Sequence, residues 1–390
     1  MSREAALALV RRLLTAARRR DLADVRECYA EDAVAESPAF GEIHGRDRIV
    51  DSWGTLFSSF SDISVDISTV LVDGDRVAVL GTLTTSDLPM WFGRQSLDVP
   101  ISYRIVLLFT IADGRVVRDQ RIYDSAGLLD RLEKLRIDRE LRTAAEVQRA
   151  LQTRTASSGP FYEAAGNSLP CRAIGGDFFD FIDLPSGDLG IVIGDVAGKG
   201  PAAALLAAMI QGMLESDVSA ESPAAALTRI NRRLIARDFG ARFSTLVYAV
   251  LSRDGRLVYS NAGHNPPVIL DGVQPLRRTS KSEGGRFQPS DFRRLTTGGP
   301  ILGTFSRASF DEDVIELARG DSIVMFTDGV IEARNADDDE LGEGRLLNVL
   351  VAHEAAAPAT LLGGIFDAVR AFGGREDQRD DITVTVTRYK

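Results

Sequence analysis

Several aspartates stand at the ends of apolar runs that have the length and composition of buried strands. Two of them close such runs, in "GIVIGD" and "SIVMFTD", and two open them, in "DFFDFIDL" and "DDITVTVT". Carboxylates that are brought together repel one another unless cations lie between them. The first question is therefore whether these four side chains meet in the folded chain: Asp177, Asp195, Asp328 and Asp380.

The loop "PSG" (185–187) predicts that the first two of these strands form a hairpin. A three-residue loop that ends in glycine is typical of hairpins, because glycine adopts the left-handed conformation of the third position. Continued from this loop, the antiparallel register puts Asp177 opposite Asp195. If the last strand is antiparallel to the strand before Asp328, then Asp380 falls at the same sheet edge as Asp328.

These four carboxylates predict a metal centre. Oxygen ligands alone, without histidine or cysteine, suit hard divalent ions such as Mg²⁺ and Mn²⁺. Two such ions, about 4 Å apart, activate a bridging water and neutralise a phosphoryl group, which is a route to phosphate ester hydrolysis. One Asp-Gly pair by itself is more simply a turn. Four carboxylates at strand ends favour the metal centre.

The stretch "IVIGDVAGKGPAAALLAAM" (191–209) has a second interpretation, a nucleotide-binding loop, because a strand, a glycine-containing turn and a helix follow one another. A P-loop requires four residues between its first glycine and the Gly-Lys pair, and then serine or threonine. From Gly194 the chain offers three, and Gly200 stands at the hydroxyl position. The turn therefore fits a metal centre better, with Lys199 as a residue at the start of a helix.

Further elements of the second half follow in blocks. Two helices and two strands are predicted over 200–216, 222–238, 242–251 and 256–263. His264, in the turn "NAGHNPP", is expected to be a structural hydrogen-bonding residue rather than a catalytic one. The polar stretch 277–297 is predicted to be a flexible loop, either a docking segment for a phosphoprotein or a disordered insert.

The first part of the chain predicts a separate α+β domain. One helix is expected over 4–19, and a second follows the N-capping Asp21 through Tyr29. Alternating or apolar runs predict antiparallel strands over 62–72, 75–86, 97–112 and 115–123. Because Asp-Gly pairs between them indicate tight hairpin turns, we expect a curved sheet packed on its helices.

Residues 4–134 resemble the SnoaL-like cone domains related to nuclear transport factor, through "HGRDRI", "WGTLFSSFSDI", "DGDRVAV" and "FTIADGRVVRDQRIYD". The resemblance implies a pocket at the open end of the cone, which serves some members as an active site and others for binding or dimerisation. Alternatively, the aromatic residues belong to the core and the histidine to a loop. The candidate pocket residues are His44, Trp53, Tyr103, Tyr123 and Asp124.

A long, highly charged helix is predicted over 127–155, and its narrow apolar stripe shifts phase between Leu135 and Ile137. Such a polar helix requires a packing partner. A parallel two-stranded coil between protomers is one candidate, and packing along its own domains is the other. The break "ASSGP" (156–160) follows. We therefore expect a sensor domain, a linker helix and a second domain over 1–126, 127–156 and 157–390.

Residues 160–390 resemble the SpoIIE-type branch of the metal-dependent (PPM) protein phosphatases. The matching motifs are "GGDFFDF", "GDVAGKGPAAA", "FSTLVYAVL", "NAGHNPP", "GGPILG", "FTDGVIEA" and "DDITV". The resemblance implies an αββα sandwich, two antiparallel sheets with helices outside, and hydrolysis of phosphoserine or phosphothreonine in proteins. The whole chain is then of the α+β class.

The same resemblance implies roles at the metal centre. Asp195 would bridge two Mn²⁺ or Mg²⁺ ions, and Val196 would contribute its carbonyl oxygen. Asp328 and Asp380 would bind the second ion. Asp177 would bind a metal or its water.

Three more positions complete this comparison. Asp381 is a weaker candidate ligand, and Arg172 is a candidate contact to substrate phosphate. The larger eukaryotic relatives have a histidine, a general acid, where this chain has Ala197. Protonation of the leaving group must then come from metal-bound water or the substrate's surroundings, so a modest rate is expected.

Composition limits the classes of partner. A net charge of −10 argues against a general nucleic-acid or anionic-membrane binder, and no apolar run approaches the roughly 18 residues of a membrane span. Cys28 and Cys171 lack metal-ligand spacing and are expected to be small core residues. The N-terminus has no signal-peptide pattern, so we expect a cytoplasmic protein.

Taken together, these patterns predict a metal-dependent serine/threonine protein phosphatase controlled by an N-terminal sensor domain. By analogy, its substrate is an anti-sigma-factor antagonist in a partner-switching pathway. The predicted protein is a homodimer that binds neither nucleic acid nor membrane, with room for a small-molecule ligand in the cone. Two alternatives are a non-catalytic phosphoprotein-binding regulator and a bifunctional protein whose cone acts on a small molecule.

Overall fold

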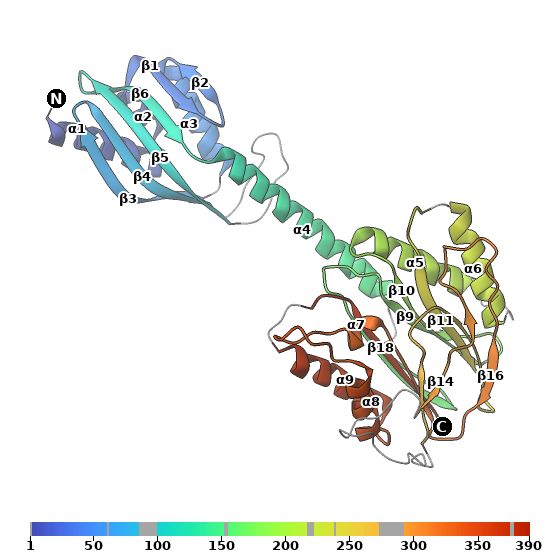
Figure 1. Ribbon diagram of the computed structural model, residues 1–390. Helices are drawn as coiled ribbons and strands as arrows, with labels where there is room; N and C mark the ends of the chain where they lie inside the picture. The colour runs from blue at the N-terminus through green and yellow to red at the C-terminus, as the bar shows by residue number, and fades with distance from the viewer. Residues whose placement is uncertain are drawn as a thin grey trace. The chain divides into compact units, whose positions relative to one another are not determined.

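A computed structural model describes residues 2–60, 62–85, 100–151, 155–216, 222–237, 239–272, 292–374 and 378–390. The chain divides into two compact units, Met1–Arg139 and Glu140–Lys390 (Figure 1). The division falls inside the long helix that was expected to be a separate linker. Most of the loop predicted over 277–297 lies outside the described residues.

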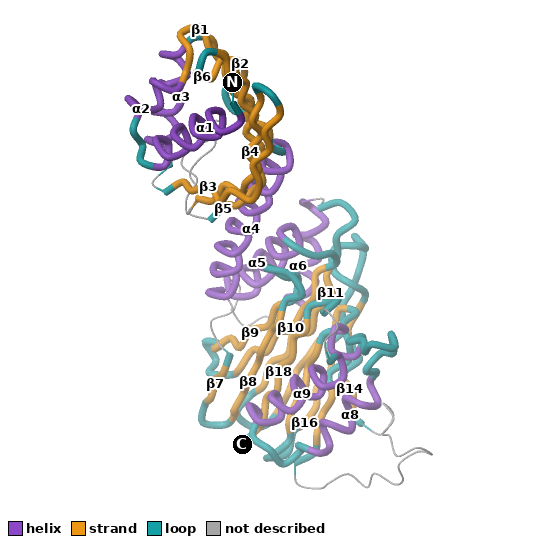
Figure 2. The backbone as a smooth tube through the Cα atoms, turned by 90° about the vertical axis from the view of Figure 1, so that its left-hand side faces the viewer, coloured by secondary structure: helices purple, strands orange, loops and turns teal. Residues whose placement is uncertain are grey.

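The N-terminal unit is a curved sheet wrapped on helices (Figure 2). Its strand order is β2-β1-β6-β5-β4-β3. The side chains of Ala6, Val10 and Leu13 form the buried stripe of the first helix. The elements are α1 (Arg3–Arg18), α2 (Leu22–Cys28), α3 (Arg46–Ser59), β1 (Tyr29–Ser37), β2 (Gly41–His44), β3 (Ile63–Asp73), β4 (Arg76–Thr85), β5 (Ile101–Ala112) and β6 (Arg115–Ile122).

Local signals in this unit were interpreted correctly. The Asp21 side chain accepts hydrogen bonds from the backbone N–H groups of Ala23 and Asp24, as an N-cap does. The Asp-Gly turns adopt positive φ angles at Gly74 and Gly114. The sequence analysis missed two strands, β1 and β2. Strand β1 pairs in parallel with the distant β6, and no local sequence pattern indicates such a pairing.

Helix α4 (Ser125–Leu151) confirms the long helix. Its first turns belong to the N-terminal unit, where Leu128 and Leu132 are buried with Phe60 and Ile101. Its last turns belong to the C-terminal unit, where Ala145 is buried with Ile174 and Ala204. Three apolar side chains of the second stripe remain exposed in the single chain: Ile137, Val147 and Leu151.

The C-terminal unit contains two mainly antiparallel sheets. One has the order β15-β12-β11-β10-β9 with β16 on β12, and the other has the order β14-β13-β17-β18-β8-β7. The predicted break after α4 contains the short strand β7. The strands are β7 (Ala156–Ser158), β8 (Tyr162–Leu169), β9 (Phe178–Asp183), β10 (Leu189–Val196), β11 (Ser244–Leu251), β12 (Arg256–Ala262), β13 (Val268–Leu270), β14 (Arg293–Arg294), β15 (Gly298–Gly299), β16 (Asp313–Glu316), β17 (Ser322–Phe326) and β18 (Ile382–Tyr389).

Helices cover the outer face of each sheet (Figure 1). One buried cluster joins the two sheets, a second joins α5 and α6 to β9–β12, and a third joins α8 and α9 to the other sheet. This is the predicted αββα sandwich. The helices are α5 (Pro201–Ser216), α6 (Pro223–Arg237), α7 (Asp328–Ile331), α8 (Glu343–Ala352) and α9 (Pro358–Gly373). No helix in the described part of the chain is both long and apolar enough to span a membrane.

Candidate metal centre

The β9–β10 hairpin brings the first two aspartates to one end of a sheet. Gly187 has a φ of +83°, and the backbone N–H of Leu184 donates to the carbonyl of Asp188 at 3.0 Å. The ladder ends at the pair Gly194–Phe178. Its register is the predicted one. The next residues along the two strands are Asp195 and Asp177.

The β17–β18 pair brings the other two aspartates to the end of the second sheet. Phe326 pairs with Val384, and the backbone N–H of Thr327 donates to the carbonyl of Thr383 at 3.0 Å. Asp328 follows directly and begins α7, while Asp380 stands two residues before β18. The predicted antiparallel arrangement is confirmed.

The carboxylates are close enough to perturb one another. Burial, together with the negative charges of Asp328 and Asp380, raises the pKa of Asp195 to about 7. Burial and then Asp380 also raise the pKa of Asp328. The described chain therefore concentrates negative charge at this edge, where divalent cations would neutralise it.

Asp177 lies deepest in the cluster. It is only 3% exposed, and its Oδ2 accepts a hydrogen bond from the Thr327 hydroxyl at 2.7 Å. Burial, followed by the charge of Asp195, raises the pKa of Asp177 well above its usual range. The Thr327 hydroxyl also accepts the backbone N–H of Thr383 at 3.0 Å, so one hydroxyl links this carboxylate to β18.

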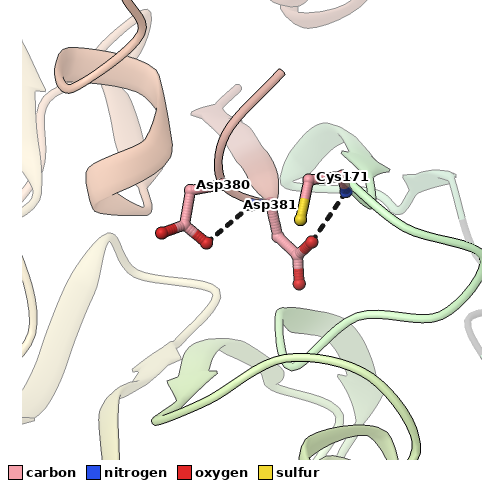
Figure 3. A group of neighbouring side chains, drawn as sticks. All are labelled: Cys171, Asp380 and Asp381. Carbon is pink, nitrogen blue, oxygen red and sulfur yellow. Dashed lines mark hydrogen bonds between the residues drawn. The ribbon is translucent and has the colours of Figure 1, made fainter. Parts of the chain in front are cut away.

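Asp381 ties a loop to the metal centre. Its Oδ1 accepts the backbone N–H of Cys171 at 2.8 Å (Figure 3). Its Oδ2 accepts the backbone N–H of Gly176, also at 2.8 Å. These bonds anchor the segment that leads into Asp177. Both oxygens of this candidate ligand are thus engaged with backbone groups.

Cys171 differs from the expectation of a core residue. It is half-buried, and its sulfur lies in a group with carboxylate oxygens of Asp380 and Asp381 whose ligand atoms are all within 4.8 Å of one another (Figure 3). Burial and the neighbouring Asp381 raise the pKa of its thiol to about 11. The long-range pairing of β8 with β18, which no local pattern shows, places this cysteine here. Cys28 is fully buried, as expected.

Glycines allow the backbone segments to approach closely. A Cβ atom at Gly176 would lie 2.6 Å from the carbonyl oxygen of Val196, the predicted backbone ligand. A Cβ at Gly329 would lie 2.0 Å from the carbonyl oxygen of Asp381. Neither distance is sterically possible without a shift. The Asp-Gly and Gly-Gly pairs are therefore required by packing at the metal centre.

Lys199 provides a positive charge in the cluster. Its Nζ lies 3.0 Å from Asp380 Oδ2 and also donates to the carbonyl of Arg379. Lys199 was expected to be a residue at the start of a helix. Its side chain also contacts Asp380 and Arg379, which precede β18 of the second sheet. The turn containing Gly198 and Gly200, both with positive φ, directs it there.

A cavity of about 330 Å³ opens beside Asp380. Its walls combine basic side chains, among them Lys199, Arg334 and Arg379, with the acidic Glu332 and Asp380 and with apolar side chains such as Phe366.

The structure also places the candidate phosphate contact Arg172 and the predicted structural residue His264. Arg172 is exposed, and within the described residues it forms no ion pair. His264 is buried, its Nδ1 is 2.8 Å from the Thr245 hydroxyl, and its backbone N–H donates to Asn261 Oδ1 at 2.8 Å. The histidine is structural, as expected.

Of the candidate pocket residues of the N-terminal unit, Trp53 lines a cavity that the structure describes. This cavity has a volume of about 320 Å³, and its described lining includes none of the other four. The rings of Tyr103 and Tyr123 pack 5.3 Å apart between centroids. His44 ends strand β2, with its exposed side chain 2.7 Å from Glu42. It is therefore not the loop residue of the alternative interpretation.

Asp124 caps a helix. Its Oδ1 accepts the backbone N–H of Gly127 at 2.8 Å, in the first turn of α4. The sequence signal for this role, an acidic residue just before a helical run, was present. The role of pocket residue was assigned to it through the family resemblance alone.

Sequence reasoning missed Gln148, which lies on α4 in the C-terminal unit. Its Nε2 donates to the carbonyl of Gly175 at 2.8 Å, and its Oε1 accepts the N–H of Gly175 at 3.2 Å. The amide therefore holds both backbone groups of a residue two positions before Asp177. A glutamine within a charged helix carries no local signal for such a contact.

Comparisons with known proteins agree with this geometry. The C-terminal unit has the fold of the PP2C domain of SiaA from Pseudomonas aeruginosa, with a TM-score of 0.54, 18% identity, and coverage of 66% of this chain and 99% of that one. Residues 185–390 match the family "Stage II sporulation protein E (SpoIIE)", and residues 10–119 match the "SnoaL-like domain". The fold and the acidic edge thus define a PP2C-type sandwich.

The chain belongs to the SpoIIE family, whose match spans more than half of it. It is 26% identical over 257 residues to the phosphoserine phosphatase RsbU of Bacillus subtilis, covering 65% of this chain and 71% of RsbU. It is 30% identical over 216 residues to Protein IcfG of Synechocystis, covering 48% of this chain. The match spans about a third of the length of IcfG (32%).

The residues present fit divalent metal ions. Asp195, Asp328 and Asp380 offer oxygen donors of the kind that Mg²⁺ and Mn²⁺ prefer. Burial, followed by the charges of neighbouring carboxylates, raises the pKa of Asp195 and that of Asp328, and bound cations would favour the charged form of both side chains. Lys199 alone does not balance them.

Proposed function

We propose that the protein is a metal-dependent phosphatase that hydrolyses phosphoserine or phosphothreonine in a protein substrate. The observation that carries this proposal is the meeting of carboxylates from two different sheets at one edge of the sandwich. Burial, followed by repulsion from Asp328 and Asp380, raises the pKa of Asp195 there. The same chemistry is supported by the names of two relatives from Bacillus subtilis, the phosphoserine phosphatase RsbU and the phosphoserine phosphatase RsbP, which is 24% identical over 212 residues.

Two divalent ions, Mn²⁺ or Mg²⁺, are the cofactors that we propose. Asp195 would bind both ions, and the Val196 carbonyl would bind one of them. Asp328 and Asp380 would bind the second ion. Asp177 would bind a metal or its water. When bound, such ions supply an activated water and neutralise phosphoryl charge. The chain contributes the placement of the donors, through the β9–β10 register and the glycine contacts.

Protein residues near the centre suggest how a substrate would be held. The cavity beside Asp380 presents Lys199 and Arg379, and Arg172 lies exposed on the loop before Asp177. These cations would attract the phosphate and acidic flanking residues. His264 is buried and its Nδ1 is hydrogen-bonded to Thr245, so we assign protonation of the leaving group to water or to the substrate's surroundings.

The substrate we propose is an anti-sigma-factor antagonist of a partner-switching pathway. The similarity to RsbU, which extends over 65% of this chain, supports this proposal. The N-terminal domain would act as a sensor that controls the phosphatase, with boundaries near 1–126 for the sensor, 127–156 for the helix and 157–390 for the catalytic domain.

Helix α4 is the element through which such control would act. Gln148 on this helix holds Gly175, in the segment that leads to Asp177. The exposed Val147 and Leu151 offer an apolar stripe that a second copy of the chain would cover in a two-stranded coil. A four-residue insertion in α4 should change activity and dimerisation. If it changes neither, this part of the proposal fails.

The test of the proposed activity is hydrolysis of a phosphoserine peptide in the presence and absence of Mn²⁺. We expect activity that EDTA removes and Mn²⁺ restores, and that falls by a factor of at least 10² in Asp195→Asn and in Asp328→Asn, since each removes a metal donor. Activity without metal, or activity that survives both substitutions, would refute the two-metal site.

Asp254→Asn is the matched control. Asp254 lies in the β11–β12 turn, at the end of the sheet opposite the acidic edge, where it accepts the backbone N–H of Arg256. This variant should retain wild-type activity. If the wild type binds phosphoprotein but shows no turnover with any divalent ion, the protein is a non-catalytic regulator instead.

A further inference from the structure

The cavity of about 320 Å³ in the N-terminal unit has a distinct chemical character. It lies between α1, α3 and strands β3 to β6, all within one compact unit. Most of its wall is apolar, with Leu56, Phe57, Ile105 and Leu107 among the lining residues. Its volume is in the range of small-molecule pockets.

Three arginines line this cavity, and none of its described lining residues is acidic. Arg11 and Arg18 are exposed residues of α1, seven positions apart, and stand at the rim. Arg121 of β6 reaches the cavity with a side chain that is only 8% exposed. Positive charge is therefore concentrated here in a chain whose net charge is −10.

Arg121 is held in place by a buried network. Its Nε and Nη2 donate to Asp119 Oδ2 at 3.2 and 3.0 Å, and Tyr29 donates to the same oxygen at 2.8 Å. Its guanidinium lies 4.4 Å from the centre of the Trp53 ring, and the indole N–H of Trp53 donates to Tyr29. The guanidinium is thus oriented before any ligand arrives.

The network leaves positive charge for a ligand. Asp119 balances one of the three arginine charges, and its two bonds use two of the five N–H groups of the guanidinium. Guanidinium pairs strongly with carboxylates, and a partly buried pair is screened little by solvent. A ligand with one anionic group at Arg121 and an apolar body along the opposite wall would match both features.

We propose that this cavity binds a small apolar molecule that carries one anionic group, with Arg121 as the anchor of that group. Arg11 and Arg18 strengthen the attraction at the entrance. The pocket defined in this way differs from the candidate set that included His44 and Asp124. It also stands independently of the phosphatase activity, since binding is measured directly.

The test compares two probes on the full-length protein by isothermal titration calorimetry. The probes are 2-naphthoate and 2-naphthamide, which share an apolar body and differ in charge. We expect 2-naphthoate to bind at least tenfold more tightly. Equal affinity of the two probes, or no binding of either, would overturn the proposal.

Variants locate the binding. Arg121→Gln should abolish the preference for the carboxylate, and Ile105→Trp should block both probes by filling the cavity while leaving Arg121 and Asp119 in place. Arg118→Gln is the matched control, because Arg118 lies on the same strand with its exposed side chain 3.4 Å from Glu36. It should bind both probes as the wild type does.

Arg121→Gln leaves the buried Asp119 without its cation and can prevent folding. The double variant Arg11→Gln/Arg18→Gln changes exposed side chains only. It should weaken 2-naphthoate about threefold or more and leave 2-naphthamide unchanged. If the double variant and Ile105→Trp both bind 2-naphthoate as the wild type does, the anion binds elsewhere and the proposal is wrong.

Discussion

The ammonium nitrogen of Lys199 lies 3.0 Å from Asp380 Oδ2. The lysine lies in the turn between β10 and α5, and the aspartate precedes β18, so this ion pair joins the two sheets at the acidic edge. Because Asp380 is a proposed metal ligand, the lysine competes with a cation for it. The positive charge of Lys199 therefore lowers the affinity of the proposed metal centre for divalent cations.

Lys199→Met should lower the Mn²⁺ concentration that gives half-maximal activity by about threefold to tenfold, because a positive charge beside the metal centre is removed. The KM for a phosphopeptide should rise, since the same charge attracts phosphate. The measurement is a Mn²⁺ titration of peptide hydrolysis. Lys134→Met, at an exposed pair with Asp130 on α4, should change neither value. An unchanged or higher Mn²⁺ requirement in Lys199→Met would contradict this account.

Gln148→Leu should reduce kcat by about tenfold and raise the Mn²⁺ requirement, while the fold is retained. The substitution keeps the size of the side chain but removes both hydrogen bonds to Gly175, each worth about 1 kcal/mol. The segment before Asp177 would then be less well positioned. Mn²⁺ titration and thermal unfolding separate the two effects.

The control for this prediction is Glu146→Gln, an exposed neighbour on the same helix. It should behave as the wild type. If Gln148→Leu leaves both kcat and the Mn²⁺ requirement unchanged, the amide contact has no part in positioning the metal centre.

Gly329→Ala should reduce activity by tenfold or more and destabilise the C-terminal unit by about 1 to 3 kcal/mol. The added Cβ would lie 2.0 Å from the Asp381 carbonyl oxygen, so the backbone beside Asp328 must move. Gly212→Ala is the matched change, because no atom lies within 4 Å of its Cβ in α5. It should stabilise the unit by about 0.5 to 1 kcal/mol. Calorimetry and peptide hydrolysis test both, and equal behaviour of the two variants would refute the steric argument.

His264 predicts how stability depends on pH. Burial lowers the pKa of His264 to about 4, below the unfolded value of about 6.5. Between these values the unfolded chain binds the proton that the folded chain rejects, so stability is lost as pH falls from 6.5 towards 4. From pH 7 to 4.5 this histidine should cost about 2 to 3 kcal/mol.

Calorimetry of the wild type and His264→Gln at both pH values isolates this contribution, since the carboxylates titrate in both proteins. The Tm of the C-terminal unit should fall about 5 to 10 °C further in the wild type than in the variant. Parallel losses of Tm in the two proteins would show that His264 is not buried in its neutral form.

Much of the fold and of the metal centre was predictable from local sequence. The three-residue loop with Gly187 set the register that ends at Gly194 and Phe178, and so placed Asp195 beside Asp177. Apolar and β-branched runs predicted β17 and β18 and hence the meeting of Asp328 with Asp380. These features depend on turn chemistry and on local hydrophobic patterning, which neighbouring residues carry.

Other parts of the metal centre depend on contacts between distant residues. Asp381 holds Cys171 and Gly176 across more than 200 positions of sequence, and Gln148 holds the loop residue Gly175 from helix α4. Cys171, expected in a core, lies beside two carboxylates for the same reason. No periodicity or turn signal encodes which side chain a loop will meet.

The N-terminal unit shows the same division. The hairpins and the N-cap of α2 were evident, whereas the parallel pairing of β1 with β6 was not. That sheet brings Asp119 and Arg121 to Tyr29 and places Arg121 at an apolar cavity. The sequence alone predicted most of the segments that become strands and helices, and it showed which strand ends carry carboxylates, because those properties are local. Tertiary structure decided which polar groups are buried together, because burial and pairing arise only when distant segments pack.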